Sequence, residues 1–245
     1  MTQELIGVWL GGLDGTTWWE QDADEPAYAA SLVKVPLATA AEAVDLDTAV
    51  RVHDDFESAV GGRFTIARED DQDDATWDAL GATETLRELR CRAIVDSSNI
   101  ATNLLLEQVG VAAVQRVLAD AGVSGRTRFT RGIGDLAARE AGLANEVTAR
   151  DLGRVLAHTP TAVEQVMLGQ RYRDGIPAGL PAGTHVANKT GWVDGLTHDM
   201  AIVRPTAAQG GAAFALVVLT RTDDSLEVAE ARIAALAAEA WERRR

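Results

Sequence analysis

The sequence predicts an α+β fold in which a mainly antiparallel sheet is flanked by helices and accompanied by an all-α subdomain. Three observations lead to this prediction. Segments with β propensity occupy both ends of the 245-residue chain, the interval between them has helical periodicity, and no internal repeat or low-complexity linker separates the parts. We therefore expect one folded unit, with a sheet subdomain made of residues 1–45 and 165–245 and an all-α subdomain made of residues 46–164.

The first elements are a β-hairpin and a helix. Residues 5–11 are apolar, Asp14-Gly15 is a strong turn signal, and residues 16–21 return as a second strand. Residues 31–43 are rich in alanine, leucine and valine, and Pro36 falls in the first turns, where a helix tolerates proline. A buried helix is therefore predicted to begin near Ser31.

The middle of the chain is predicted to be mostly helical. An acidic run at residues 69–74 lacks the glycine and the closing glutamate of a calcium loop, so we interpret it as a solvated loop and assign no metal. Thr83 is expected to cap the first helix of the block. Further helices are predicted over residues 99–109, 111–121 and 148–156.

The last third of the chain returns to the sheet. Thr159 is the expected cap of a short helix with Pro160 in its first turn. Strands are predicted at residues 185–189, 200–203 and 214–220, followed by a long helix over residues 223–244. The stretch 125–145, which lies before these elements, contains Gly132, Gly134 and Gly142 and has the length of a functional or Ω-like loop.

Composition excludes several classes of protein. A formal charge of −14 argues against nucleic acid, because a nucleic-acid binder needs a basic stripe. No apolar run has the roughly 18 residues of a membrane helix. The single Cys91 cannot form an internal disulfide, and residues 1–4 lack the features of a signal peptide. We expect a cytoplasmic monomer that acts on a small molecule, without nucleic acid, membrane or metal.

Lysine is rare in this chain. Of 23 basic residues, only Lys34 and Lys189 are lysines. Arginine replaces lysine wherever a surface charge is sufficient, but not where a compact amine must lose its proton or act as a point donor. The two lysines are therefore candidates for chemistry before any motif is considered.

Both lysines lie in short motifs. Ser31 and Lys34 form the pattern S-x-x-K and stand one helical turn apart, residues 97–99 (SSN) lie between two predicted helices, and residues 189–191 (KTG) end a predicted strand. In this order and spacing the three elements resemble the S-x-x-K, S-D-N and K-T-G motifs of the serine β-lactamase and penicillin-binding protein superfamily. The class A β-lactamase-like branch is the most similar, and the resemblance covers nearly the whole chain.

The resemblance implies a role for each motif residue. Ser31 would be the acylated nucleophile, with Lys34 as the base that activates it. Ser97 would pass a proton to the leaving nitrogen, so we expect Lys34, Ser97 and Lys189 to converge on the Ser31 hydroxyl. Asn99 would hold Lys34 and the amide of the substrate.

The third motif would bind the rest of the substrate. Lys189 and Thr190 would take its carboxylate, and Gly191 and Trp192 would line it from the same strand. The backbone N–H groups of Ser31 and Trp192 would form the oxyanion hole. The implied activity is a serine hydrolase acylated by β-lactams or related amides and esters, without a cofactor. Alternatives are a cytoplasmic esterase or peptidase on the same scaffold, and a penicillin-recognising domain that does not turn over.

Two departures from the family pattern bear on function. The middle residue of the second motif is Ser98 instead of aspartate. In the Ω-loop, the alignment through residues 127–131 places Ile133 where the glutamate that activates the deacylating water belongs. We interpret Asp135 and Glu140 as solvated loop carboxylates, and the spacing of Arg131 and Glu146 suggests an ion pair that closes the loop. Turnover is therefore expected to be weak.

Overall fold

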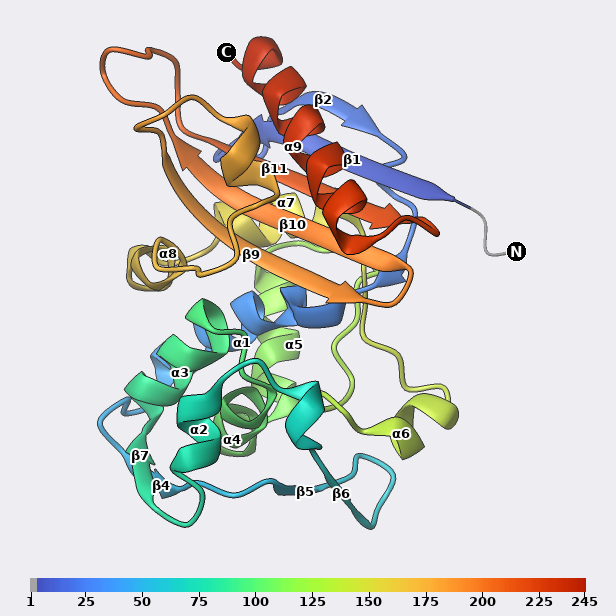
Figure 1. Cartoon of the computed structure of the whole chain (residues 1–245), viewed down its shortest axis with the longest axis vertical. Coiled ribbons are helices and arrows are strands. Elements are labelled where there is room, and N and C mark those ends of the chain that lie inside the picture. The colour runs from blue at the N-terminus through green and yellow to red at the C-terminus, as the bar shows by residue number, and fades with distance from the viewer. Residues whose placement is uncertain (1–3) are drawn as a thin grey trace.

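The two ends of the chain form one five-stranded sheet in the computed structural model, which describes residues 4–245. The strand order is β2, β1, β11, β10, β9, and each neighbouring pair is antiparallel. The strands are Leu5–Gly12 (β1), Thr17–Gln21 (β2), His185–Val193 (β9), Leu196–Arg204 (β10) and Phe214–Arg221 (β11). The N-terminal hairpin thus pairs with the last strand, and the predicted antiparallel α+β fold is confirmed (Figure 1).

Both faces of the sheet are covered by helices (Figure 1). Helix α9 (Leu226–Arg243) packs on one face, and α7 (Ala149–Ala157) packs on the other. Strand β11 is buried almost throughout because its alternating side chains enter both layers. On the α7 side, Gly153 allows close contact, since a Cβ there would lie 2.3 Å from the Trp9 ring.

The remaining helices pack around α1 (Lys34–Ala40), below the sheet in Figure 1. A single apolar cluster runs from the inner face of the sheet through α1 into this helical half. The other helices are α2 (Asp74–Asp78), α3 (Leu86–Val95), α4 (Asn99–Val109), α5 (Val111–Asp120), α6 (Leu136–Glu140) and α8 (Thr161–Met167).

Short elements connect these parts. Four 3₁₀ segments span Ala30–Val33 (η1), Ala41–Ala43 (η2), Arg68–Asp70 (η3) and Ile176–Gly179 (η4). Three two-stranded ladders pair Ala27–Tyr28 (β3) with Glu146–Val147 (β8), Ala49–Arg51 (β4) with Thr83–Thr85 (β7), and Asp55–Glu57 (β5) with Arg63–Thr65 (β6). The interval 46–164, predicted to be all helical, therefore also contains short strands.

Helix starts differ from the sequence prediction at α3 and at α8. Thr83 lies in β7, and Thr85 caps α3 by accepting from the Glu88 N–H at 3.2 Å. Pro160 is itself the N-cap of α8, while the Thr159 hydroxyl donates to the Val155 carbonyl at the end of α7. The cap of α3 thus lies two positions from the predicted one, and α8 begins without a side-chain cap.

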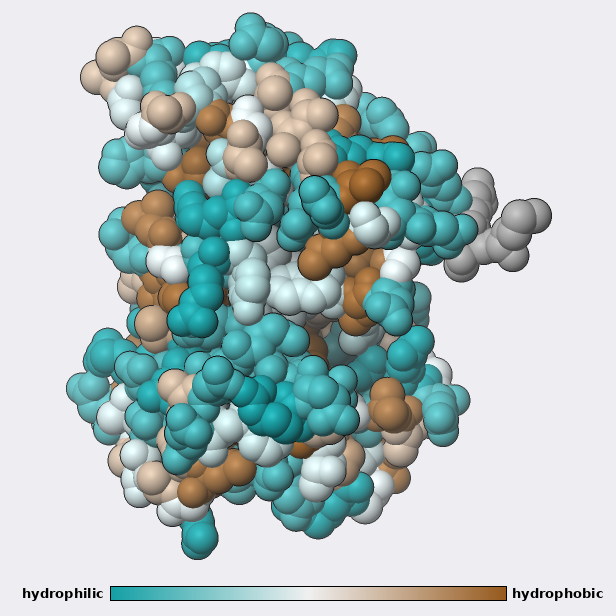
Figure 2. All heavy atoms as spheres, viewed as in Figure 1, coloured by the Kyte–Doolittle hydropathy of each residue, from teal (hydrophilic) through white to brown (hydrophobic). Residues whose placement is uncertain are grey.

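The acidic run 69–74 is not a solvated loop throughout. Asp71 and Asp73 are each only 4% exposed. Asp73 caps α2 by accepting from the backbone N–H groups of Ala75 and Thr76. The run therefore contributes structural hydrogen bonds as well as surface charge, although the face over α2 is still mostly hydrophilic (Figure 2). Within residues 4–245, no helix is long and apolar enough to cross a membrane.

Candidate active site

Ser31 lies at the junction between the sheet and the helical half. It belongs to η1, which leads directly into α1, so the predicted helix begins as a 3₁₀ turn. Ser31 is half-buried, whereas Lys34 is 1% exposed. The preceding Ala30 has a φ of 44°, a left-handed conformation that is costly for a residue with a Cβ and that clusters at functional sites. The local backbone is thus specialised next to the candidate nucleophile.

Strand β9 makes a close approach to Ser31 at Gly191. A Cβ at this position would lie 2.9 Å from the Ser31 nitrogen and 3.3 Å from the Leu32 nitrogen. Only glycine fits between the two backbones without displacing one of them. The structure therefore brings the first and third motifs together, with the amide of Ser31 beside the strand that carries Gly191.

Two buried amines meet at the second motif. Lys34 Nζ donates to the Ser97 carbonyl at 2.7 Å and lies 3.2 Å from Ser97 Oγ. Lys189 Nζ lies 3.0 Å from the same hydroxyl and donates to the Thr190 carbonyl at 2.9 Å. Among residues 4–245 neither amine bonds to Ser31 Oγ, so the predicted convergence on that hydroxyl is corrected to a convergence on Ser97.

Asn99 and Asp71 complete this cluster. Asn99 Oδ1 accepts from Lys34 Nζ at 2.8 Å, and its amide nitrogen donates to the Asp70 carbonyl. Asp71 Oδ2 accepts from Ser98 Oγ at 3.1 Å and from the backbone N–H groups of Asn99 and Ile100 at 2.9 and 2.8 Å. Sequence analysis missed Asp71, since only its place in the acidic run marked it.

Burial and charge lower the pKa values of both lysines. Lys34 has a pKa well below its ordinary value, chiefly because of burial and then because of the positive charge of Lys189; Asp71 opposes the shift. Burial lowers the pKa of Lys189 to about 7, opposed by Asp199. Burial likewise raises the pKa of Asp199, on β10, to about 7. Lys189 is therefore suited to losing or gaining a proton near neutral pH, and Lys34 loses its proton more readily than an ordinary lysine.

The predicted substrate strand has one polar group without a partner. Thr190 is 7% exposed, and its hydroxyl oxygen has no hydrogen-bond partner among the described residues. An unpaired buried hydroxyl next to a site is explained when a ligand supplies the missing bond. Trp192 packs edge to face on Tyr172 with 4.8 Å between ring centroids. Sequence analysis gave no signal for Tyr172, which lies in the segment between α8 and β9.

The neck of the Ω-loop is closed by Arg131 and Asn145. Arg131 is 2% exposed, and its guanidinium donates to the carbonyls of Gly132 and Leu143. The Asn145 side chain accepts from the Arg131 N–H and donates to the Arg131 carbonyl. The predicted ion pair between Arg131 and Glu146 is wrong, because Glu146 pairs with Arg128 across the bridge between their backbones.

Ile133 is fixed inside this loop by Asn103 of α4. The Asn103 side chain accepts from the Ile133 N–H at 2.9 Å and donates to its carbonyl at 2.9 Å. The Ile133 side chain is partly buried and packs against the main apolar cluster. This position therefore offers an alkyl group and no carboxylate.

The two loop carboxylates have different environments. Asp135 is fully buried, which corrects the predicted solvated position, and it accepts from Ser58 Oγ, the Ala59 N–H and the Ala138 N–H at 2.9, 2.8 and 3.1 Å. It ties the β5–β6 hairpin to the start of α6. Glu140 is exposed at the end of α6, as predicted. Asp135 is thus engaged in holding the loop.

His198 lies on β10, opposite Gly191, and is fully buried. Its Nδ1 accepts from the Thr220 N–H at 3.1 Å, so the proton is on Nε2, which donates to the Tyr28 carbonyl at 3.0 Å. Burial lowers its pKa to about 4. The ring is neutral and holds the segment that leads to Ser31.

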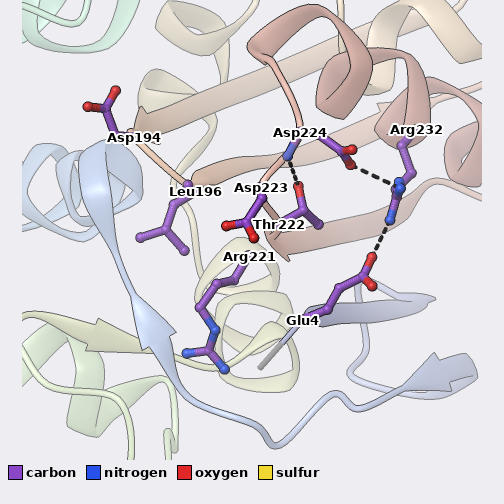
Figure 3. A pocket seen from close by; sticks show the side chains of 9 residues that line it. Glu4, Asp194, Leu196, Arg221, Thr222, Asp223, Asp224 and Arg232 are labelled. Atoms are coloured by element: carbon purple, nitrogen blue, oxygen red, sulfur yellow. Dashed lines mark hydrogen bonds and ion pairs between the residues drawn. The ribbon is translucent and has the colours of Figure 1, made fainter. Parts of the chain in front are cut away.

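Two cavities are lined by residues other than the three motifs. One, of about 470 Å³, lies where the β9–β10 turn, the end of β11 and the start of α9 meet. In it Arg232 pairs with both Glu4 and Asp224 (Figure 3). The other, of about 630 Å³, lies between the β5–β6 hairpin and α4 and includes Asn103 and Gly132.

Comparison with known proteins gives one consistent result. The model of the β-lactamase enzyme family matches residues 2–243. A search of curated proteins gave no match. Solved structures similar to this chain include a β-lactamase from Xanthomonas campestris pv. campestris (21% identity, TM-score 0.79, 98% of this chain and 91% of that chain). A β-lactamase from Sphaerobacter thermophilus (24%, 0.74, 98% and 90%) and PBP-A (18%, 0.76, 99% and 92%) share the fold as well.

Proposed function

The chain belongs to the β-lactamase enzyme family, and we propose that it is a serine hydrolase acylated on Ser31 by β-lactams or related amides and esters. The observation that carries the proposal is the Ser97 hydroxyl between the buried amines of Lys34 and Lys189, at 3.2 and 3.0 Å. Such a chain of hydroxyl and amine groups with lowered pKa values is what an activated serine requires.

The proposed acylation uses these groups, with Lys34 three residues after Ser31 at the start of α1. Neutral Lys34 takes the proton of Ser31 Oγ as the oxygen attacks the carbonyl carbon of the substrate. The C–N bond then breaks, Ser97 Oγ donates its proton to the leaving nitrogen, and Lys34 returns a proton to Ser97 across 3.2 Å. Serine is thereby acylated and Lys34 is neutral again. The backbone N–H groups of Ser31 and Trp192 stabilise the oxyanion, a contribution of about 3 to 4 kcal/mol per donor.

Substrate binding uses the opposite end of the cluster. Protonated Lys189 attracts a carboxylate, and the unpaired Thr190 hydroxyl donates to it. The Asn99 amide, oriented by Lys34 and Asp70, holds the side-chain amide of the substrate. A small acyl compound with a carboxylate near the scissile bond therefore fits the site.

The acyl-enzyme is expected to be long-lived. Hydrolysis of the ester needs a base for the attacking water, and Ile133 supplies none. Asp135 is held by three hydrogen bonds, and Glu140 is exposed. We therefore expect acylation to be faster than deacylation, with weak β-lactamase turnover.

Intact-protein mass spectrometry tests the proposal. Mixing the protein with benzylpenicillin is expected to add the mass of one whole β-lactam, and Ser31→Ala is expected to remain unmodified. An unmodified wild-type protein, or an adduct that persists in Ser31→Ala, contradicts the proposal. Steady-state hydrolysis of nitrocefin then measures turnover.

An esterase or peptidase activity on the same residues is the second candidate. Ile133 favours this candidate. Without a loop carboxylate the penicilloyl ester on Ser31 is expected to be stable, so a substrate that turns over must form an acyl-enzyme that hydrolyses without that base. A panel of p-nitrophenyl esters separates the two activities. Turnover of an ester together with a stoichiometric, stable penicillin adduct supports the second candidate.

A further inference from the structure

The second motif receives a carboxylate from a distant segment of the chain. Where the family pattern has aspartate between serine and asparagine, this chain has Ser98. Asp71 approaches the same place from the loop between η3 and α2, and its Oδ2 accepts from Ser98 Oγ at 3.1 Å. Asp71 is 4% exposed, so this contact is buried.

The Asp71 carboxylate also fixes the start of α4. Its Oδ2 accepts from the backbone N–H groups of Asn99 and Ile100, while Oδ1 accepts from the Asp73 N–H at 3.0 Å. A carboxylate is favoured at the N-terminus of a helix, where N–H groups lack partners within the helix. Four hydrogen bonds to one side chain therefore determine the position of Asn99.

The contacts continue from Asn99 to the candidate base. Asn99 Oδ1 accepts from Lys34 Nζ at 2.8 Å, and its amide nitrogen is bound by the carbonyl next to Asp71, that of Asp70. Among the described residues, two charged groups shift the pKa of Lys34: Lys189 on β9 lowers it, and the Asp71 carboxylate raises it. Asp71 thus holds the partner of Lys34 and supplies a negative charge near it.

We propose that Asp71 is a positioning residue for acylation, which orients Asn99 and Lys34 and takes the place of the aspartate missing from the second motif. This inference rests on the proposed function, in which Lys34 is the base. In this view the carboxylate that the motif lacks at position 98 is supplied by position 71, which accepts from the Ser98 hydroxyl.

A charge-exchange experiment tests this. Asp71→Ser removes the carboxylate, Ser98→Asp adds a second one, and the double variant D71S/S98D restores one carboxylate facing one hydroxyl. We expect each single variant to lower the second-order rate constant of acylation by benzylpenicillin about 100-fold, because small displacements of catalytic groups have effects of this size. The double variant is expected to recover to within about tenfold of wild type, as coupled neighbours do.

Asp73 provides the matched control. It lies two residues away, is equally buried and caps α2, but its side chain accepts from Ala75 and Thr76 and not from the motif. Asp73→Ser is expected to lower the melting temperature without changing the acylation rate. If Asp71→Ser behaves like Asp73→Ser, or if D71S/S98D is no more active than D71S, the proposal is overturned.

The two lysines allow a test that does not depend on acylation. Selective labelling with ¹³C at the lysine ε carbon gives two side-chain signals, and Lys34→Arg assigns them. We expect Asp71→Asn to lower the pKa of Lys34 further and to leave that of Lys189 unchanged, with Asp73→Asn changing neither. An unchanged or raised Lys34 pKa in Asp71→Asn overturns the proposal, whereas a wild-type protein that is never acylated overturns the proposed function alone.

Discussion

Lys34 and Ser97 are joined by two hydrogen bonds, from the amine to the carbonyl at 2.7 Å and to the hydroxyl at 3.2 Å. Ser97 has a φ of 59°, a left-handed conformation in which its carbonyl and hydroxyl both reach the same amine. This conformation costs about 1 to 3 kcal/mol and persists only where the surroundings determine it. The strained Ser97 backbone places the Ser97 hydroxyl between the amines of Lys34 and Lys189.

Lys34→Arg is expected to abolish acylation and leave the fold intact. A guanidinium keeps the charge but does not release a proton in proteins, so it cannot act as the base. Labelling by a fluorescent penicillin measures acylation, and circular dichroism checks the fold. Lys34→Met, which keeps the chain length without the amine, should be equally inactive. Undiminished labelling of either variant would refute the role of Lys34.

Gly191→Ala is expected to lower the acylation rate about 10²- to 10³-fold, the effect of losing one oxyanion donor. The added Cβ would lie 2.9 Å from the Ser31 nitrogen, so either the strand or η1 must move. Gly125→Ala is the control, because a Cβ there meets nothing within 4 Å. Stopped-flow measurement with nitrocefin checks both variants, and equal rates for the two would contradict the close approach as a functional constraint.

The pKa of Lys189, about 7, predicts how acylation by carboxylate-bearing β-lactams depends on pH. As the pH rises through 7, the free amine loses the charge that attracts the carboxylate. The ratio of acylation rate constants for benzylpenicillin and its methyl ester should therefore fall above about pH 7. The ratio removes the contribution of Lys34, which is common to both substrates. A ratio that stays constant from pH 6 to 9 would show that Lys189 does not bind the carboxylate.

His198 is expected to destabilise the protein in acid. Its pKa is about 4 in the folded state and about 6.5 when exposed, so the unfolded chain binds a proton first as the pH falls. The contribution of neutral His198 to stability is complete above pH 6.5 and is lost between pH 6.5 and 4, by about 3 kcal/mol in total. Urea unfolding of wild type and His198→Gln over this range measures the difference. Parallel pH dependences would contradict the low pKa.

The fold could be predicted because its signals are local. Strand β11 is buried on both faces, and this burial gives a continuous apolar run in the sequence. Helix α4 begins at Asn99 and ends at Val109, the bounds that its helical periodicity predicts. Helix caps were misplaced by one or two residues, as with Thr83 and Thr85, because several polar residues near each start could satisfy the same N–H groups.

The site was only partly predictable for a different reason. The rarity of lysine and three short motifs marked Lys34, Ser97 and Lys189, which the structure brings together. Asp71 and Tyr172 could not be found, because their importance depends on contacts with segments far away in the chain. The pairing of Glu146 with Arg128 instead of Arg131 likewise follows from the backbone bridge between them, which spacing does not reveal.

The fate of the acyl-enzyme depends on the position that Asn103 holds. Asn103 binds the N–H and the carbonyl of Ile133, so the backbone at position 133 is held in place whatever side chain it carries. A variant there therefore changes the chemistry of the side chain without first having to reorganise the loop. The loop neck, with Arg131 and Asn145 buried, adds to this rigidity.

Ile133→Glu is accordingly expected to convert slow deacylation into turnover. A carboxylate at this position would act as the general base for water attack on the Ser31 ester, and such help raises rates by about 10² to 10⁴. Wild type should show a nitrocefin burst equal to the enzyme concentration followed by a slow phase, whereas Ile133→Glu should show a faster steady state with an unchanged burst rate. Ile133→Gln, with the same shape and no base, should retain the slow phase. Rapid linear turnover by wild type, lost in Asp135→Ala or Glu140→Ala, would show instead that the loop already contains its base.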